Sequence, residues 1–77
     1  MIDEQELLRT LGQHIRAVRK ARGLTQEQLA ELCEFDPTYV SLLERGQRNP
    51  PYLTLCLLAD KLNSTVDALI GGSSRAA

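Results

Sequence analysis

Residues 24–46 decide the fold, and they read LTQEQLAELCEFDPTYVSLLERG. Thr25 and Gln28 have the spacing of a capping box, which predicts that a helix begins at Thr25. Asp36 followed by Pro37 predicts the start of a second helix, because Asp caps free N–H groups and proline is tolerated at the first helical position. Two short helices that begin this close together predict a helix-turn-helix unit.

The small and apolar residues of this stretch fit the packing that such a unit requires. Ala30 is expected where the two helices cross, since a larger side chain would push them apart. Val40 and Leu43 are three residues apart and are expected to face inward. Leu32 is expected on the buried face of the first helix, and Gly46 is expected to end the second. The two predicted helices cover residues 25–33 and 36–45.

Helices are also predicted on both sides of this unit, because no period-two alternation indicates strands. Asp3 is expected to cap the first of them, Tyr52 to point inward from the fourth, and Ser64 to cap the last. These flanking helices cover residues 3–22, 52–63 and 65–70. The fold class is therefore all-α, a compact five-helix bundle that contains a helix-turn-helix. Its domain covers residues 1–70, and residues 71–77 form a flexible C-terminal tail.

Length and composition limit the possible classes of protein. The chain has 77 residues, enough for one small domain, and 43% of them are hydrophobic. No apolar run approaches the roughly 20 residues that a bilayer span needs, and the acidic N-terminus does not have the character of a secretion signal. A cytoplasmic location is expected. The net charge of −1 argues against DNA binding, but the arginines lie in two clusters that the fold can bring together.

The predicted unit, with Arg48-Asn49-Pro50 after it, resembles the lambdoid-repressor and Cro type of helix-turn-helix regulators, also called the Xre family. The resemblance covers about residues 8–70. It implies a lambda-repressor-like DNA-binding domain and a transcriptional regulator that binds a palindromic double-stranded operator as a homodimer, on the nucleoid when bound. The stretch from Thr38 to Arg45 is also similar to the controller proteins of restriction–modification systems, for which RNA polymerase is a further candidate partner.

The resemblance also implies which residues contact DNA. The second helix of the unit would lie in the major groove while the first crosses the backbone. Gln26 would point at a phosphate or a base edge, and Arg16 and Arg19 are weaker phosphate candidates. The polar residues on the exposed side of the recognition helix, expected to reach bases or phosphates, are Thr38, Tyr39 and Ser41. The residues expected to clamp phosphates after it are Arg45, Arg48 and Asn49.

Other polar residues have structural interpretations. Glu44 is expected to pair with a nearby arginine, because a carboxylate beside phosphates would repel them. Arg9, Lys20 and Arg22 are expected to form a solvated face, and His14 to lie on the surface. Glu34 departs from the family pattern, which has glycine at this turn position, and a left-handed backbone there would cost on the order of 1 kcal/mol.

Dimerisation is predicted from apolar residues that have no place in the core of a single chain. Leu53 and Leu57 are four apart, on the side of the fourth helix away from its expected buried face. With Leu69 and Ile70 they are expected to form an exposed apolar patch that a second copy covers. A twofold dimer through the fourth and fifth helices would place two recognition helices roughly 34 Å apart, one turn of DNA.

The sequence also bears on two other classes of function. An antitoxin-like regulator, whose main ligand is another protein, would share this fold, but few residues follow the last predicted helix. An enzyme is disfavoured, because the sequence has no Ser/His/Asp set, metal-ligand cluster or phosphate-cradling glycine loop. Neither a cofactor, nor a metal, nor a small-molecule ligand is therefore expected. Cys33 and Cys56 are expected to be small core residues, with a redox-sensing role as the alternative.

Overall fold

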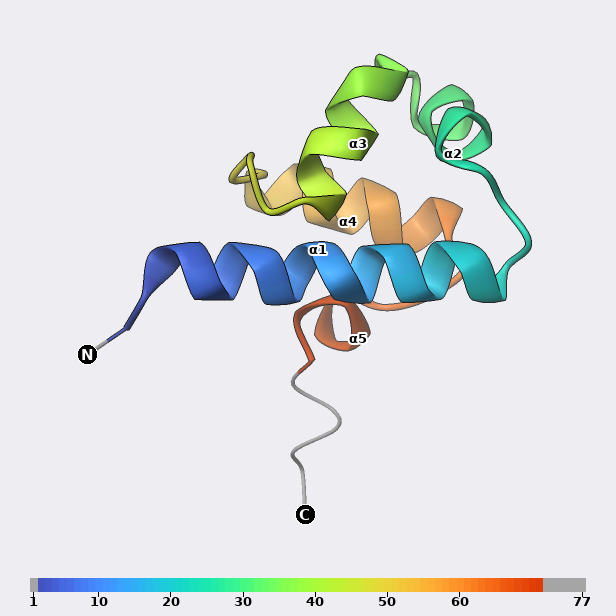
Figure 1. The fold of residues 1–77 in the computed structure, drawn as a ribbon. Helices are drawn as coiled ribbons and strands as arrows, with labels where there is room; N and C mark the ends of the chain where they lie inside the picture. Colours follow the sequence, from blue (N-terminus) through green and yellow to red (C-terminus); the bar gives the residue numbers. More distant parts are fainter. Residues whose placement is uncertain (1, 72–77) are drawn as a thin grey trace.

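The computed structural model describes residues 2–71, which contain five helices joined by short turns and loops (Figure 1). The helices are α1 (Glu4–Ala21), α2 (Gln26–Cys33), α3 (Pro37–Glu44), α4 (Tyr52–Lys61) and α5 (Val66–Ile70). The long α1 crosses the molecule, with α2 and α3 on one side of it and α5 on the other. The predicted all-α fold with a helix-turn-helix is confirmed. The predicted tail lies outside the described residues except for Gly71.

The helix starts follow the predicted capping residues closely. The Asp3 carboxylate accepts hydrogen bonds from the first turn of α1, and Thr25 and Gln28 form the complete capping box of α2. The Asp36 carboxylate accepts from the N–H of Thr38 at 2.8 Å, which fixes the start of α3. The last cap differs from the prediction, because Thr65 and not Ser64 caps α5.

The core lies between the five helices: α1 packs against α3 and α5, α2 packs against α3 and α4, and α4 packs against α5. Its buried hydrophobic residues are Ile15, Leu29, Ala30, Cys33, Val40, Leu43, Leu58, Ala59, Leu62 and Leu69. Two residues expected in it are exposed: Leu32 is 46% exposed and Tyr52 is 68% exposed. Both lie on helices of only eight and ten residues, where few turns face the core and one apolar position can lie at its edge.

The backbones of α1 and α3 approach each other closely at Gly12. A Cβ placed on this residue would lie 2.5 Å from the carbonyl oxygens of both Leu43 and Glu44. Glycine is therefore required here by the space between two helices, although it weakens the interior of an isolated helix. This contact fixes how the C-terminal end of α3 rests on α1.

The turn between α2 and α3 contains the left-handed residue that the sequence suggested. Glu34 has φ 59° and ψ 40°, and its N–H bonds back to the last turn of α2. The next N–H, that of Phe35, donates to the carbonyl of Ala30 at 2.8 Å. The left-handed backbone is kept here without glycine, so the turn has the family geometry with a strained residue in it.

Two polar side chains that were expected on the surface also bond to helix ends. Arg22 donates to the backbone carbonyls of Leu62 and Asn63, at 2.7 and 2.8 Å, and so holds the end of α4. Nδ1 of His14 donates to the carbonyl of Leu69 at 2.9 Å when it carries the ring proton. Arg22 is exposed, as expected, but the sequence did not indicate that its guanidinium would bond helix-end carbonyls, and His14 is half-buried where a surface position was expected.

Candidate nucleic-acid interface

An open hollow of about 830 Å³ lies between α1 and the start of the helix-turn-helix, and we call it the α2–α3 hollow. Residues from all three of these helices line it, together with the residues before α2. The polar and charged ones are Arg16, Arg19, Thr25, Gln26, Glu27, Thr38, Ser41, Glu44 and Arg45. The fold therefore brings together residues that are up to 29 positions apart, from Arg16 to Arg45.

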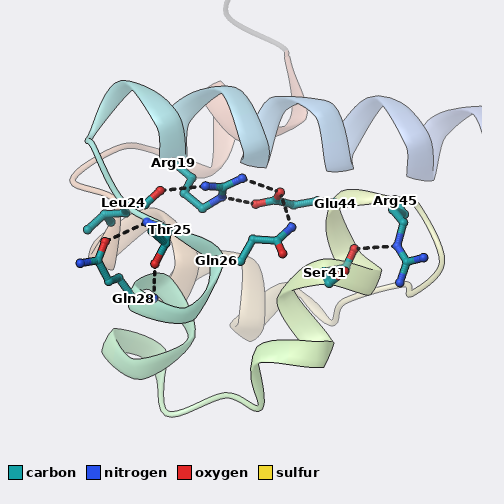
Figure 2. A network of polar contacts seen from close by, with 8 residues as sticks. All are labelled: Arg19, Leu24, Thr25, Gln26, Gln28, Ser41, Glu44 and Arg45. Atoms are coloured by element: carbon teal, nitrogen blue, oxygen red, sulfur yellow. Dashed lines mark hydrogen bonds and ion pairs between the residues drawn. The ribbon is translucent and has the colours of Figure 1, made fainter.

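A buried ion pair between two of the residues that line this hollow joins α1 to α3 (Figure 2). Arg19 Nε donates to Glu44 Oε2 at 2.6 Å, and Nη2 donates to Oε1 at 3.0 Å. The same guanidinium donates through Nη1 to the carbonyl of Leu24 at 2.7 Å. The expected pairing of Glu44 is confirmed, and its partner Arg19 is thereby removed from the phosphate candidates, because its charge is already neutralised inside the protein.

Gln26 is held by this ion pair at the N-terminus of α2. Its Nε2 donates to Glu44 Oε1 at 3.0 Å, and the side chain is half-buried (Figure 2). One amide proton is thus fixed, and the amide group has a second proton and an acceptor oxygen to offer. The predicted position at the α2 terminus is confirmed, and contact with DNA remains a prediction.

The recognition helix presents its polar residues in two different ways. Thr38 is exposed and Ser41 half-exposed, and both line the hollow, where hydroxyls can donate to or accept from bases and phosphates. Tyr39 is anchored more firmly, since its ring meets Phe35 edge-to-face with 5.1 Å between centroids and packs against the core. Tyr39 does not line the hollow, and its predicted contact with DNA stays a prediction.

The basic residues after α3 are exposed. Arg45 lines the hollow, and its Nε makes only a long 3.4 Å bond to the carbonyl of Ser41. Arg48 and Asn49 lie in the loop that follows, outside the hollow, and Arg48 donates to the carbonyl of Gln47. Arg16 is exposed on α1 and also lines the hollow. These cations have no acidic partner among residues 2–71, so phosphates can bind them without breaking an ion pair.

Comparison with known proteins agrees with this geometry. The helix-turn-helix family matches residues 15–69, which is more than half of the chain. The chain belongs to the helix-turn-helix family. The matched residues of this helix-turn-helix protein include the whole α2–α3 unit, and the function of the family is DNA-binding transcriptional regulation.

Three relatives of this helix-turn-helix protein are similar over most of its length. The immunity repressor protein of Bacillus phage phi105 is 44% identical over 62 residues, which are 80% of this chain and 43% of the repressor. Control protein C.SmaI of Serratia marcescens is 40% identical over 60 residues, 78% of this chain and 71% of its own. The restriction-modification controller protein C.AhdI of Aeromonas hydrophila is 42% identical, with a TM-score of 0.78 over 80% of this chain and 94% of its own.

The four residues predicted to mediate dimerisation do not form one exposed patch. Leu53 is 78% exposed on α4, and Leu57 is half-buried against the core. Leu69 is fully buried, so its predicted place on an exposed surface was wrong; it lies on the inner side of the short α5. Ile70 is exposed and lines a separate apolar groove with α1 residues such as Leu11. The exposed Tyr52 beside Leu53 enlarges the α4 part of the surface.

The two cysteines are free, and they differ in how deeply they are buried. Cys33 belongs to the core, as expected, and burial raises the pKa of its thiol, which keeps it protonated and unreactive. Cys56 is only half-buried, so its assignment to the core was wrong. It accompanies the exposed Tyr52, whose hydroxyl pKa is raised mainly by a hydrogen bond with Cys56.

Among residues 2–71 no helix is both long and apolar enough to cross a membrane.

Proposed function

We propose that this helix-turn-helix regulator binds a palindromic DNA operator as a homodimer and controls the transcription of restriction–modification genes. The observation that carries the proposal is the α2–α3 hollow, which Thr38 and Ser41 of α3 line together with Arg16 and Arg45, two arginines without an ion-pair partner among residues 2–71. Hydroxyls at the first turns of a recognition helix can read base edges, and flanking arginines fix the register by holding phosphates.

The restriction–modification assignment is supported by the two controller relatives. C.SmaI and C.AhdI are about as similar to this chain in sequence as the phage repressor, but the match extends over 71% and 94% of their lengths and over only 43% of the repressor. A regulator of this kind that activates transcription would have RNA polymerase as a partner. The proposal involves no enzymatic reaction, cofactor or small-molecule ligand, and it places the protein in the cytoplasm, on the nucleoid when bound.

The homodimer is supported by the exposed apolar surface at the start of α4. Tyr52 and Leu53 are 68% and 78% exposed, while Leu58 and Leu62 of the same segment are buried in the core. When a partner covers two adjacent apolar side chains, the removal of their surface from water lowers the free energy of the complex. A twofold arrangement would present two copies of α3 to successive turns of the major groove.

The test is the selection of bound duplexes from a random DNA pool by the purified protein at about 150 mM salt. We expect enrichment of a palindrome whose half-sites are roughly one helical turn apart. The triple variant Thr38→Ala, Ser41→Ala and Arg45→Gln is the matched control, because these side chains are solvent-accessible and its fold should survive. Enrichment by this variant of the same palindrome would refute the assigned interface. Absence of enrichment by the unmodified protein would favour the alternative, a regulator that acts mainly by binding another protein.

A further inference from the structure

Arg9 lies beside the end of the recognition helix, although it is 36 residues away from Arg45 in the sequence. A Cβ placed on Gly46, the residue after Arg45, would lie 2.8 Å from Cα of Arg9 and 2.9 Å from its Cγ. The first part of the Arg9 side chain therefore rests on the glycine that ends α3. Together with the Gly12 contact, this fixes the position of Arg9 relative to the recognition helix.

Arg9 also lies on the same stripe of α1 as Arg16, which lines the α2–α3 hollow. Seven residues rotate a helix to within about 20° of two full turns, so the two side chains leave α1 in nearly the same direction. They are separated by about 10 Å along the helix axis, since each residue rises about 1.5 Å. Arg9 thus extends the basic edge of the hollow beyond Arg16, alongside the end of α3.

The guanidinium of Arg9 makes no interaction with the rest of the protein. Among residues 2–71 the Arg19–Glu44 contact is the single ion pair, and the Arg9 side chain forms no hydrogen bond and is exposed. Glu6, one turn before it on α1, does not pair with it. This differs from Arg19 and Arg22, whose guanidinium groups are used to hold helices together. Arg9 is therefore solvated, as expected, and it carries a positive charge beside α3 on a side chain whose first carbons are held against Gly46.

We propose that Arg9 binds a phosphate of the DNA backbone next to the C-terminal end of the recognition helix. The contact extends the interface along α1 and is independent of base sequence. It rests on DNA binding through α3 and requires neither the palindrome nor the dimer. Because Arg9 and Arg16 leave α1 about two turns apart, each would hold a different phosphate.

The salt dependence of DNA binding tests this proposal. Fluorescence anisotropy would measure the affinity of the unmodified protein and of Arg9→Gln for a labelled duplex of mixed sequence, about two helical turns long. The affinities of both proteins would also be measured for a duplex enriched by the selection above, and compared with those for the mixed-sequence duplex. The slope of log K against log salt is negative, and the loss of one phosphate contact should make it shallower by about 0.9 per bound protomer. We expect Arg9→Gln to bind about tenfold more weakly at about 50 mM salt and about threefold more weakly at about 200 mM.

Two further variants separate a phosphate contact from other effects. Lys61→Gln removes the same charge from α4, at an exposed position that does not line the hollow, and should keep the original slope. Arg9→Lys keeps the charge and should restore most of the affinity, with all unfolding midpoints unchanged.

An unaltered slope in Arg9→Gln, an equal loss in Lys61→Gln, or a loss confined to the selected duplex would each overturn the proposal. A lowered unfolding midpoint that Arg9→Lys does not correct would show a structural role and would also overturn it. If the selection enriches nothing, the mixed-sequence duplex still decides the role of Arg9.

Discussion

Gly12 shows how the absence of a single methyl group sets the distance between α1 and α3. Alanine is favoured over glycine by about 1 kcal/mol inside a helix. At Gly12 the added Cβ would meet two backbone carbonyl oxygens at 2.5 Å, and neither is the end of a flexible side chain. The steric cost of overpacking, about 1–3 kcal/mol or more, therefore exceeds the gain in helix propensity.

We predict that Gly12→Ala lowers the free energy of unfolding by about 1–2 kcal/mol, measured by urea denaturation. The exposed Ala17 on the same helix provides the control, because Ala17→Gly reports the propensity term alone and should cost about 1 kcal/mol. A Gly12→Ala protein more stable than the original would show that α1 and α3 can move apart without loss.

The Arg19–Glu44 pair makes a second prediction at this scale. The two side chains are 9% and 3% exposed, so removing one partner leaves the other charge buried and uncompensated. Glu44→Leu should therefore lower the free energy of unfolding by about 3–5 kcal/mol. The double variant Arg19→Met with Glu44→Leu should recover most of this loss, because no unpaired charge remains. Urea unfolding of the single and double variants forms a complete cycle, and additive losses would contradict a coupled pair.

At the scale of one element, the end of α2 carries a strained residue. Glu34 has φ 59°, a conformation that costs most residues on the order of 1 kcal/mol and glycine almost nothing. Glu34→Gly should raise the thermal midpoint, with a gain of up to about 1 kcal/mol. Asn63 has φ 53° after α4 and supplies the comparison, because Asn tolerates this region and Asn63→Gly should gain less. Equal gains at the two sites would show that the strain is not specific to Glu34.

The helix boundaries could be predicted well because their causes are local. Asp3, Thr25 and Asp36 cap the helices that their spacing indicated, and each bond joins residues at most three positions apart. Ser64 was misjudged because Thr65 beside it has an equivalent hydroxyl, and the choice depends on how the chain leaves α4. Local chemistry therefore gives the elements and leaves uncertainties of one residue at their ends.

The roles of particular side chains were harder to predict because they depend on contacts distant in the sequence. Arg19 and Arg22 looked like the other arginines of α1, yet one pairs with a residue 25 positions away and the other with a carbonyl 40 positions away. Gly12 gave no signal at all, since a lone glycine in a helical pattern does not reveal which backbone it faces. Leu69 was expected on the surface and is buried, whereas Tyr52 was expected in the core and is exposed. Periodicity shows which residues share a face of a helix, but it does not show which face another element covers.

For the whole molecule, the proposed dimer predicts how assembly and DNA binding are linked. Leu53→Lys places a charge at a position that is 78% exposed in one chain, so the fold should be kept while the contact between copies is weakened. We expect sedimentation equilibrium to give monomers at concentrations where the unmodified protein is dimeric, and operator binding to weaken at least tenfold. The control is Leu7→Lys, at another exposed leucine that lies in the groove beside Ile70. A Leu53→Lys protein that remains dimeric would exclude the α4 surface.

The buried contacts of Glu44 have a consequence for the time course of recognition. Through Arg19 and Gln26 this one carboxylate joins α1, α2 and α3, so these helices are already ordered before DNA arrives. Binding should then carry little of the entropy loss and heat-capacity change that accompany coupled folding. Encounters with correct and incorrect sites would form at similar rates, and discrimination would lie in how long each complex lasts. For this regulator, the residence time on DNA would measure its specificity.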